Sequence, residues 1–235
     1  MTADQHAPIH AMQGQRVVVA GADHGVGPAV VAALCGAGAT VVVDAPGHDG
    51  ATSIGGDGDF LAQSLAHLGG IDVLVVSAPP VKNKPVFEMT PDELRSVTET
   101  ELVQPALLML EASKAMAKNG YGRIIAFASM SAKTGPHHNV APYAAAKGGL
   151  LAYVRALASE TAEHGVTVNG IATALFEPQV AIMTEEKRAG LKKGIPVGRF
   201  GRSDEAAHAV LFLASPLAGF VTGECLNLSG GRFMD

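Results

Sequence analysis

The sequence has few cysteines, no tryptophan and no excess of basic residues. Only two of its 235 residues are cysteines, Cys35 and Cys225, and none is tryptophan. The cysteines stand singly in apolar surroundings, without the paired spacing of a zinc site, so we expect two reduced, buried thiols and no metal site. The 17 Lys and Arg are outnumbered by 22 Asp and Glu, form no basic cluster and leave a net charge of −5. We therefore expect a small-molecule substrate rather than a nucleic acid or an anionic membrane as partner.

Long apolar runs are missing as well. No stretch reaches the roughly 20 residues of a membrane-spanning helix, and the first residues are polar, without the apolar centre of a signal peptide. We therefore expect a cytoplasmic protein whose residues 1–13 are flexible. Hydrophobic residues make up 48% and charged residues 17%, which is typical of a globular chain with a large apolar core. The length fits one α/β domain as well as two small ones, and we take residues 1–235 as a single domain.

The first candidate site is a glycine-rich turn between a strand and a helix. Residues 16–20 are apolar after Arg16 and predict a strand, and residues 28–36 are rich in Ala and Val and predict a helix that begins at Pro28. Glycines between them let the backbone turn tightly and approach a pyrophosphate, whose charge the free amides of a helix start attract. This order is typical of a dinucleotide-binding unit, although glycine turns are common in α/β proteins generally. The cofactor contacts expected here are Gly21, Asp23, His24, Gly25, Val26 and Gly27.

Asp44 follows the second expected strand, residues 40–43. A carboxylate at this place can accept hydrogen bonds from the adenosine ribose hydroxyls and would repel a 2′-phosphate. The alternative is an ordinary turn residue at the end of a strand. Residues 17–81 contain no Lys or Arg that could attract a 2′-phosphate, although His24 could contribute a little. The sequence therefore favours NAD(H) over NADP(H).

The remaining pattern predicts a parallel sheet that is covered by helices on both faces. Further strands are expected at residues 71–76, 124–128, 166–172 and 224–228, and helices at 60–68, about 91–117 and 204–214, with Pro105 kinking or splitting the second helix. Alternating strands and helices give a doubly wound, three-layer α/β/α sheet. Residues 46–59 have a loop composition.

The expected carboxyl ends of the strands gather several polar residues, as ligand sites of such sheets require. The glycine turn, Asp44, Ser77, Ser129 and Thr173 all fall there. Just downstream, Tyr143 and Lys147 stand four residues apart and therefore share one helix face, where a cation and the helix N-terminus favour the phenolate. Such a pair is more often a solvated surface pair than a proton donor. Its position beside the strand ends favours the chemical interpretation.

The chain contains Gly21-xxx-Gly25-x-Gly27 followed by Tyr143-xxx-Lys147, and in this it resembles the short-chain dehydrogenase/reductase family from about Gly14 to Asp235. It looks most like the 3-oxoacyl reductase branch of that family at residues 196–201, 212–215 and 222–231. The resemblance implies a Rossmann fold and hydride transfer between a nicotinamide and an alcohol or ketone. It implies that Tyr143 is the general acid or base, that Lys147 lowers its pKa and holds the nicotinamide ribose, and that Ser129 orients the substrate oxygen. It also implies a homotetramer or dimer. Further cofactor contacts would be Ala45, Ser77, Ala78 and Thr173.

Residues 45–70 are too few for the family's usual helix, third strand and helix, so we expect the third strand to be shortened or missing. The chain departs from the family's pattern in three further places. The family's Asn-Asn-Ala-Gly corresponds to residues 76–79, where Ala78 alone is retained, and its Pro-Gly after the sixth strand corresponds to Thr173-Ala174. The helix asparagine of its proton relay corresponds to Glu101, which serves a relay differently or disables it. Residues 173–195 are the segment expected to close over the substrate.

Two other functions stay open at this point. A dehalogenase relative of the family cleaves halohydrins with Ser, Tyr and Arg and without a nicotinamide, and it looks similar at residues 77–79. Lys147 and the three glycines argue against it here. A nucleotide-binding homologue without turnover would also fit the three departures.

Overall fold

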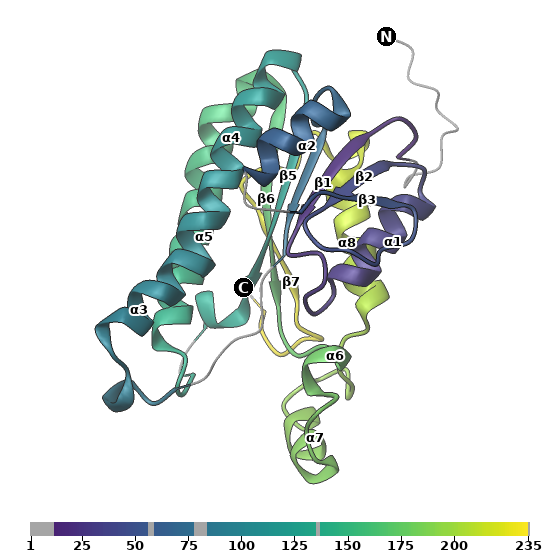
Figure 1. Ribbon diagram of the computed structural model, residues 1–235. Helices are drawn as coiled ribbons and strands as arrows, with labels where there is room; N and C mark the ends of the chain where they lie inside the picture. The colour runs from purple at the N-terminus through teal and green to yellow at the C-terminus, as the bar shows by residue number, and fades with distance from the viewer. Residues whose placement is uncertain (1–11, 56–58, 78–83, 135–136, 235) are drawn as a thin grey trace.

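The computed structural model describes residues 12–55, 59–77, 84–134 and 137–234. Within them, seven parallel strands form one sheet in the order β3-β2-β1-β4-β5-β6-β7 (Figure 1). The strand order reverses between β1 and β4, as in a doubly wound fold, so the predicted fold class is confirmed. The strands are β1 (Arg16–Ala20), β2 (Thr40–Val43), β3 (Ala51–Ser53), β4 (Val73–Val76), β5 (Gly122–Ser129), β6 (Val166–Thr173) and β7 (Cys225–Leu228).

Helices cover both faces of the sheet and complete three layers. Helices α1 and α8 lie on one face, and α2, α4 and α5 on the other (Figure 1). The helices are α1 (Gly27–Gly36), α2 (Phe60–Leu68), α3 (Pro91–Thr98), α4 (Gln104–Asn119), α5 (Ala141–Thr161), α6 (Glu177–Val180), α7 (Glu185–Lys192) and α8 (Ser203–Ala214). Short 3₁₀ turns are η1 (Val86–Glu88), η3 (Met130–Ala132), η4 (Ala162–His164) and η5 (Pro216–Ala218), and η2 (Glu99–Val103) is a π-helical turn.

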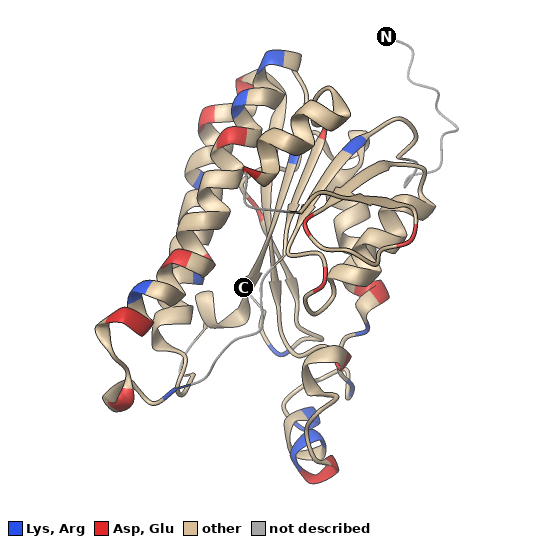
Figure 2. Cartoon of the chain, in the orientation of Figure 1, with Lys and Arg blue, Asp and Glu red and all other residues tan. Residues whose placement is uncertain are grey.

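The continuous valine runs of the strands follow from burial on both faces. In β1, Val17 and Val19 pack in the core under α1 and α8, whereas Val18 packs in the core under α2, α4 and α5. Successive side chains of a strand point to opposite faces, so a central parallel strand needs apolar residues at every position. Charged residues lie mainly on helices, α7 among them, and in loops, and the strands carry few of them (Figure 2).

The long helix expected from residue 91 is split, as the position of Pro105 predicted. Thr90 caps α3: its Oγ1 accepts from the Glu93 amide at 3.2 Å, and its amide donates to Glu93 Oε2 at 2.8 Å. Since Pro105 has no N–H, the carbonyl of Glu101 loses its helical donor. The chain widens by one residue at η2, where the Gln104 amide donates to the Glu99 carbonyl. Glu101 therefore lies in a π-helical turn, a feature found frequently at functional sites.

Four expectations about local structure need correction. Residues 46–59 are not all loop, because β3 pairs with β2 at the sheet edge, so the third strand is short rather than missing. The segment 173–195 is not an open loop: Thr173 ends β6, and α6 and α7 form a lobe that projects from the sheet (Figure 1). The last helix begins at Ser203, and its cap position is Arg202. Cys35 and Cys225 are partly rather than fully buried.

None of the helices formed by the described residues is both long and apolar enough to cross a bilayer. The same residues bring together no group of three His, Cys, Asp or Glu side chains that could hold a metal ion.

Candidate active site

The carboxyl ends of the strands meet at one edge of the sheet. The register of β5 and β6 places Ser129 beside Thr173, and that of β6 and β7 places Thr173 beside Leu228. The Ser77 amide donates to the Ala20 carbonyl at 2.8 Å, which ties the end of β4 to the end of β1. The fold therefore brings the predicted polar residues to the edge where such sheets bind ligands. The predicted contact Ala78 lies outside the described residues.

The three glycines of the turn serve different purposes. Gly21 has a φ of +75°, and a Cβ there would lie 2.7 Å from the Ser77 carbonyl oxygen. Gly27 packs its backbone against the turn, since a Cβ would lie 2.2 Å from the Ala22 carbonyl oxygen. Gly25 also has a left-handed φ, +55°, but no described atom lies within 4 Å of a Cβ built there. Gly21 and Gly27 thus shape the turn, and Gly25 leaves space that a ligand can approach.

The start of α1 can receive an anion. Its cap residue Val26 makes no side-chain capping bond within the described part of the chain, and the first turn carries no acidic residue. Asp23 is exposed and His24 partly exposed beside it. The Gly27 amide donates to the His24 carbonyl at 2.8 Å and Pro28 has no N–H, so the attraction for negative charge comes mainly from the positive end of the helix dipole. Together with the open space at Gly25, this arrangement fits the pyrophosphate of a dinucleotide.

Asp44 has a structural contact that the sequence did not predict. Its Oδ2 accepts from the Gly21 amide at 2.6 Å, and its Oδ1 accepts from the Ala22 amide at 3.0 Å. The carboxylate therefore fastens the glycine turn to the end of β2. The side chain is still exposed, and a carboxylate has about four acceptor positions, so it can also accept from a ribose hydroxyl. The neighbouring Ala45 is buried.

Ser129, Tyr143 and Lys147 lie together at the ends of β5 and α5. Tyr143 is 9% exposed and lies in the first turn of α5, and Lys147 is 1% exposed and lies one turn further on. Lys147 Nζ is 5.9 Å from the centre of the Tyr143 ring and donates to the Phe127 carbonyl at 3.0 Å. Ser129 lies close enough to Tyr143 for its hydroxyl to lower the pKa of the phenol. Its oxygen accepts from the amide and the hydroxyl of Ser131, at 3.2 and 2.9 Å.

Glu101 is a fourth member of this group, and the sequence singled it out only as a departure from the family's asparagine. It is 4% exposed, and its Oε2 lies 3.0 Å from Lys147 Nζ. The two groups form a buried ion pair, although no described donor is well aligned for a hydrogen bond to this oxygen. The sequence does contain a signal for this position: Glu101 stands four residues before Pro105, in a helix that Pro105 interrupts.

The electrostatics of the site correct one expectation. The pKa of Tyr143 is raised to about 12, first because the phenol is buried and second because Glu101 is negative, while the hydrogen bond from Ser129 lowers it. Burial lowers the pKa of Lys147, and the charge of Glu101 opposes that shift. Lys147 was expected to lower the pKa of Tyr143. The pKa of Tyr143 is instead raised, because burial and the negative charge of Glu101 both disfavour the phenolate.

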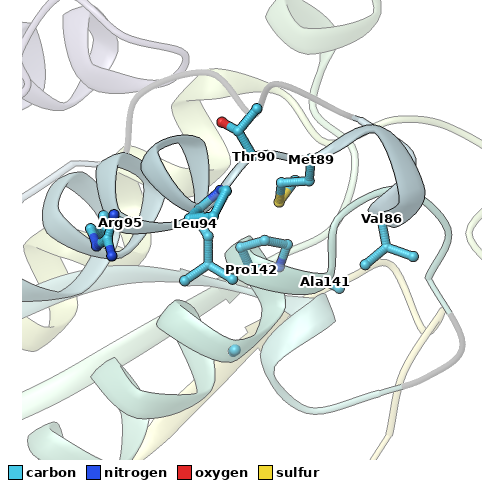
Figure 3. Close-up of a pocket in the computed structure, with 9 residues that line it drawn as sticks. Val86, Met89, Thr90, Leu94, Arg95, Ala141 and Pro142 are labelled. Atoms are coloured by element: carbon cyan, nitrogen blue, oxygen red, sulfur yellow. The ribbon is translucent and has the colours of Figure 1, made fainter.

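Two cavities flank the site. One of about 530 Å³ lies between α3 and the start of α5, where Val86, Met89, Leu94 and Pro142 make its wall largely apolar (Figure 3). Among the described residues neither Tyr143 nor Ser129 lines it, so we do not equate it with the reaction site. The other, of about 210 Å³, lies beyond the ends of β6 and β7 and is bounded by Ala174, Leu175, Phe176, Asn227, Leu228 and Ser229, among others.

Known proteins resemble the chain along most of its length. A family model described as enoyl-(acyl carrier protein) reductase matches residues 58–232. The 3-oxoacyl-[acyl-carrier-protein] reductase FabG of Escherichia coli is 33% identical over 241 residues, which cover 94% of this chain and 98% of that protein. The FabG of Aquifex aeolicus is 30% identical over 245 residues, with the same two coverages.

Solved structures give the same picture. A putative short-chain alcohol dehydrogenase from Sinorhizobium meliloti superposes with a TM-score of 0.85 at 30% identity, covering 96% of this chain and 98% of that chain. A protein described as a dehalogenation enzyme superposes with a TM-score of 0.87 at 26% identity, covering 95% of this chain and all of that chain.

Proposed function

Since the chain belongs to the short-chain dehydrogenase/reductase family, we propose that it transfers a hydride between NAD(H) and a secondary alcohol or ketone, with Tyr143 as the general acid and base. The observation that carries the proposal is the grouping of Tyr143, Lys147 and Ser129 at the same sheet edge as the glycine turn. A reductase or dehydrogenase of this family needs a proton donor beside the place where a carbonyl oxygen is held.

The cofactor would be held by the glycine turn, with its pyrophosphate at Gly25 and the start of α1 and its adenosine ribose at Asp44. When bound, a nicotinamide supplies or accepts the hydride, which the side chains of the protein cannot do. The exposed Asp44 carboxylate beside Gly21 and the absence of Lys and Arg from residues 17–81 support NAD(H) over NADP(H). Ser77, Ala78 and Thr173 would complete the nicotinamide side of the site.

Ser129 is set to hold the substrate oxygen. Because its own oxygen accepts two hydrogen bonds from Ser131, its hydroxyl hydrogen is left to donate. It can donate to the phenol of Tyr143 or to a carbonyl oxygen beside it. Tyr143 then gives its proton to the oxygen that becomes negative as the hydride reaches the carbonyl carbon.

The first test combines cofactor titration with a paired set of tyrosine variants. NADH and NADPH are titrated by fluorescence, and ketones and alcohols are then screened for turnover. Tyr143→Phe should lower kcat by about 10²-fold or more and leave the affinity for NADH nearly unchanged, because only the acidic proton is lost. Tyr153→Phe on the same helix should leave both quantities at the parent level. Full turnover of Tyr143→Phe would refute the assignment, and tighter NADPH than NADH would refute the cofactor preference alone.

Two alternatives are distinguished by the same experiment. The structural likeness to a dehalogenation enzyme supports a lyase, which would release halide from a halohydrin without any nicotinamide. Saturable cofactor binding without turnover of any substrate would support a nucleotide-binding homologue. An assembly of two or four chains is also proposed, and the fully exposed side chains of Phe87 and Phe220 support it.

A further inference from the structure

The carboxylate of Glu101 is buried beside the proposed proton donor. An isolated ionised carboxylate would not be stable in such a place, because burial removes its hydration. Its partner is the ammonium of Lys147, with Nζ and Oε2 3.0 Å apart. Lys147 is even less exposed than Glu101 and has the Phe127 carbonyl as its other acceptor. The pair is therefore neutral as a whole, and its ammonium lies 5.9 Å from the centre of the Tyr143 ring.

Other charges on the elements packed around Tyr143 are engaged elsewhere or face solvent. On α3, Arg95 pairs with Asp92, and on α4, Lys114 pairs with Glu111, all four exposed. Arg123 lies at the far end of β5 and donates to the carbonyls of residues 215 and 216. The others are Glu93 of α3, which pairs with Lys84; Lys133, which donates to Asn227 Oδ1; and the exposed Glu99, Lys118, His137, His138, Arg155 and Glu160. Among the described residues, Glu101 is the charge that acts on the Tyr143 proton.

We propose that Glu101 is a positioning residue with two effects: it holds the buried ammonium of Lys147 in a neutral ion pair, and its negative charge keeps the phenol of Tyr143 protonated. The site is then built to give a proton to a carbonyl oxygen rather than to take one from an alcohol. This inference rests on the proposed function and deepens it, because it assigns carbonyl reduction as the favoured direction at neutral pH.

A count of charges gives the physical reason. With Glu101 ionised, Lys147 protonated and Tyr143 neutral, the group has no net charge. Loss of a proton from either the Tyr143 phenol or the Lys147 ammonium leaves one uncompensated negative charge in a buried place, which is unfavourable. Without the carboxylate the group would carry one positive charge, and loss of a proton would make it neutral. Glu101 therefore opposes the formation of the phenolate.

The two directions of the reaction need opposite states of Tyr143. In reduction, the carbonyl carbon receives a hydride, which brings two electrons from the reduced nicotinamide. The carbonyl π bond breaks, and the oxygen takes the proton of Tyr143. The phenolate left behind is reprotonated from solvent. In oxidation, Tyr143 must already be a phenolate before it can accept the proton of the alcohol, so the carboxylate of Glu101 confines that direction to alkaline pH.

The decisive measurement is the ionisation of Tyr143 in the protein without cofactor. The chain has three tyrosines and no tryptophan, so phenolate absorbance can be followed with little background. The parent, Glu101→Gln and Glu101→Asp are each titrated against the same protein carrying Tyr143→Phe, and the difference isolates Tyr143. In the parent, Tyr143 should remain a phenol well past the ordinary tyrosine pKa of about 10. In Glu101→Gln its ionisation should move down by about one pH unit or more.

Two controls separate charge from structure. Glu101→Asp keeps the charge and should titrate like the parent. Glu99→Gln removes an exposed carboxylate from the same turn and should shift nothing. Circular dichroism and thermal melting establish that each variant is folded at the pH of the measurement. An unchanged Tyr143 midpoint in folded Glu101→Gln would overturn the inference.

The activity readout then tests the direction of the reaction. With a ketone and its alcohol from the substrate screen, the rise of oxidation rate with pH should move to lower pH in Glu101→Gln, while reduction of the ketone should lose rate at its alkaline end. If the Tyr143 midpoint shifts in Glu101→Gln but the parent turns over no substrate, the electrostatic role of Glu101 is supported and the redox function is refuted. Turnover with identical pH profiles in parent and variant would keep the redox function and refute the role of Glu101.

Discussion

Replacing Gly27 with alanine should destabilise the fold and weaken cofactor binding together. Gly27 is the first residue of α1, and a Cβ there would lie 2.2 Å from the carbonyl oxygen and 2.8 Å from the carbonyl carbon of Ala22. These are backbone atoms of a turn that the carboxylate of Asp44 holds by two amide hydrogen bonds. Neither side of the contact can move without disturbing β1, β2 or α1.

The magnitude follows from the kind of atom that obstructs the methyl group. Overpacking of a buried site costs about 1–3 kcal/mol, and occasionally more. The obstructing atoms belong to the backbone, and the Cβ would lie well inside contact distance of them. We therefore expect a destabilisation at the upper end of this range, about 3 kcal/mol. For a chain of this size each kcal/mol lowers the melting temperature by about 2–4 °C, so Gly27→Ala should melt roughly 6–12 °C below the parent.

Gly36→Ala is the matched control, since Gly36 ends the same helix and no described atom lies within 4 Å of a Cβ placed there. It should raise the free energy of unfolding by about 0.5–1 kcal/mol, because alanine loses less backbone entropy in a helix. Urea unfolding and thermal melting measure both variants, and NADH titration measures the effect on the site. A Gly27→Ala protein that melts and binds NADH like the parent would refute the assignment of Gly27 as a packing contact.

Two further predictions concern the fold. Arg123 is 4% exposed and donates to the carbonyls of Ser215 and Pro216 beyond the end of α8. Arg123→Met should therefore lower the free energy of unfolding by about 1–3 kcal/mol, because these acceptors are left unpaired. Urea unfolding of the variant at parental stability would contradict this. Burial alone would raise the pKa of Asp72, but hydrogen bonds and the charge of Arg16 lower it. That stabilisation is fully present above the unfolded pKa of about 3.9 and is lost as pH falls through the lower folded pKa. Asp72→Asn should therefore flatten the loss of stability in acid, and an unchanged acid dependence would contradict the role of the pair.

The central strands could be read from the sequence because their signal is local. The apolar runs at residues 16–20 and 40–43 predict β1 and β2 with the observed bounds, since both faces of each strand are buried. Residues 51–53 are Ala, Thr and Ser, and they form an edge strand through hydrogen bonds to β2 alone. An edge strand with little buried surface needs no apolar run, so its sequence resembles a loop.

The positions of the candidate site were also predictable, but its electrostatics were not. The spacing of Tyr143 and Lys147 places both on one helix face, and the end of β5 delivers Ser129 to them, all from local pattern. The charge state of Lys147 depends on Glu101, which is distant in sequence. Likewise, the contact of Asp44 with the glycine turn depends on how the ends of β1 and β2 lie in space. Pairwise charge effects of this kind require the tertiary structure.

The buried pair of Glu101 and Lys147 is better explained by the reaction than by stability. Replacing both members of a buried ion pair by apolar residues is often neutral or stabilising, whereas removing one member leaves an uncompensated charge. The fold therefore gains little from having the pair, and the π-helical turn that carries Glu101 adds an irregularity that only Pro105 requires. A lysine is needed beside Tyr143 to hold a nicotinamide ribose in the proposed function. Given that buried lysine, the proposed role of the carboxylate, which is to keep the ammonium charged and the phenol protonated, accounts for both residues together.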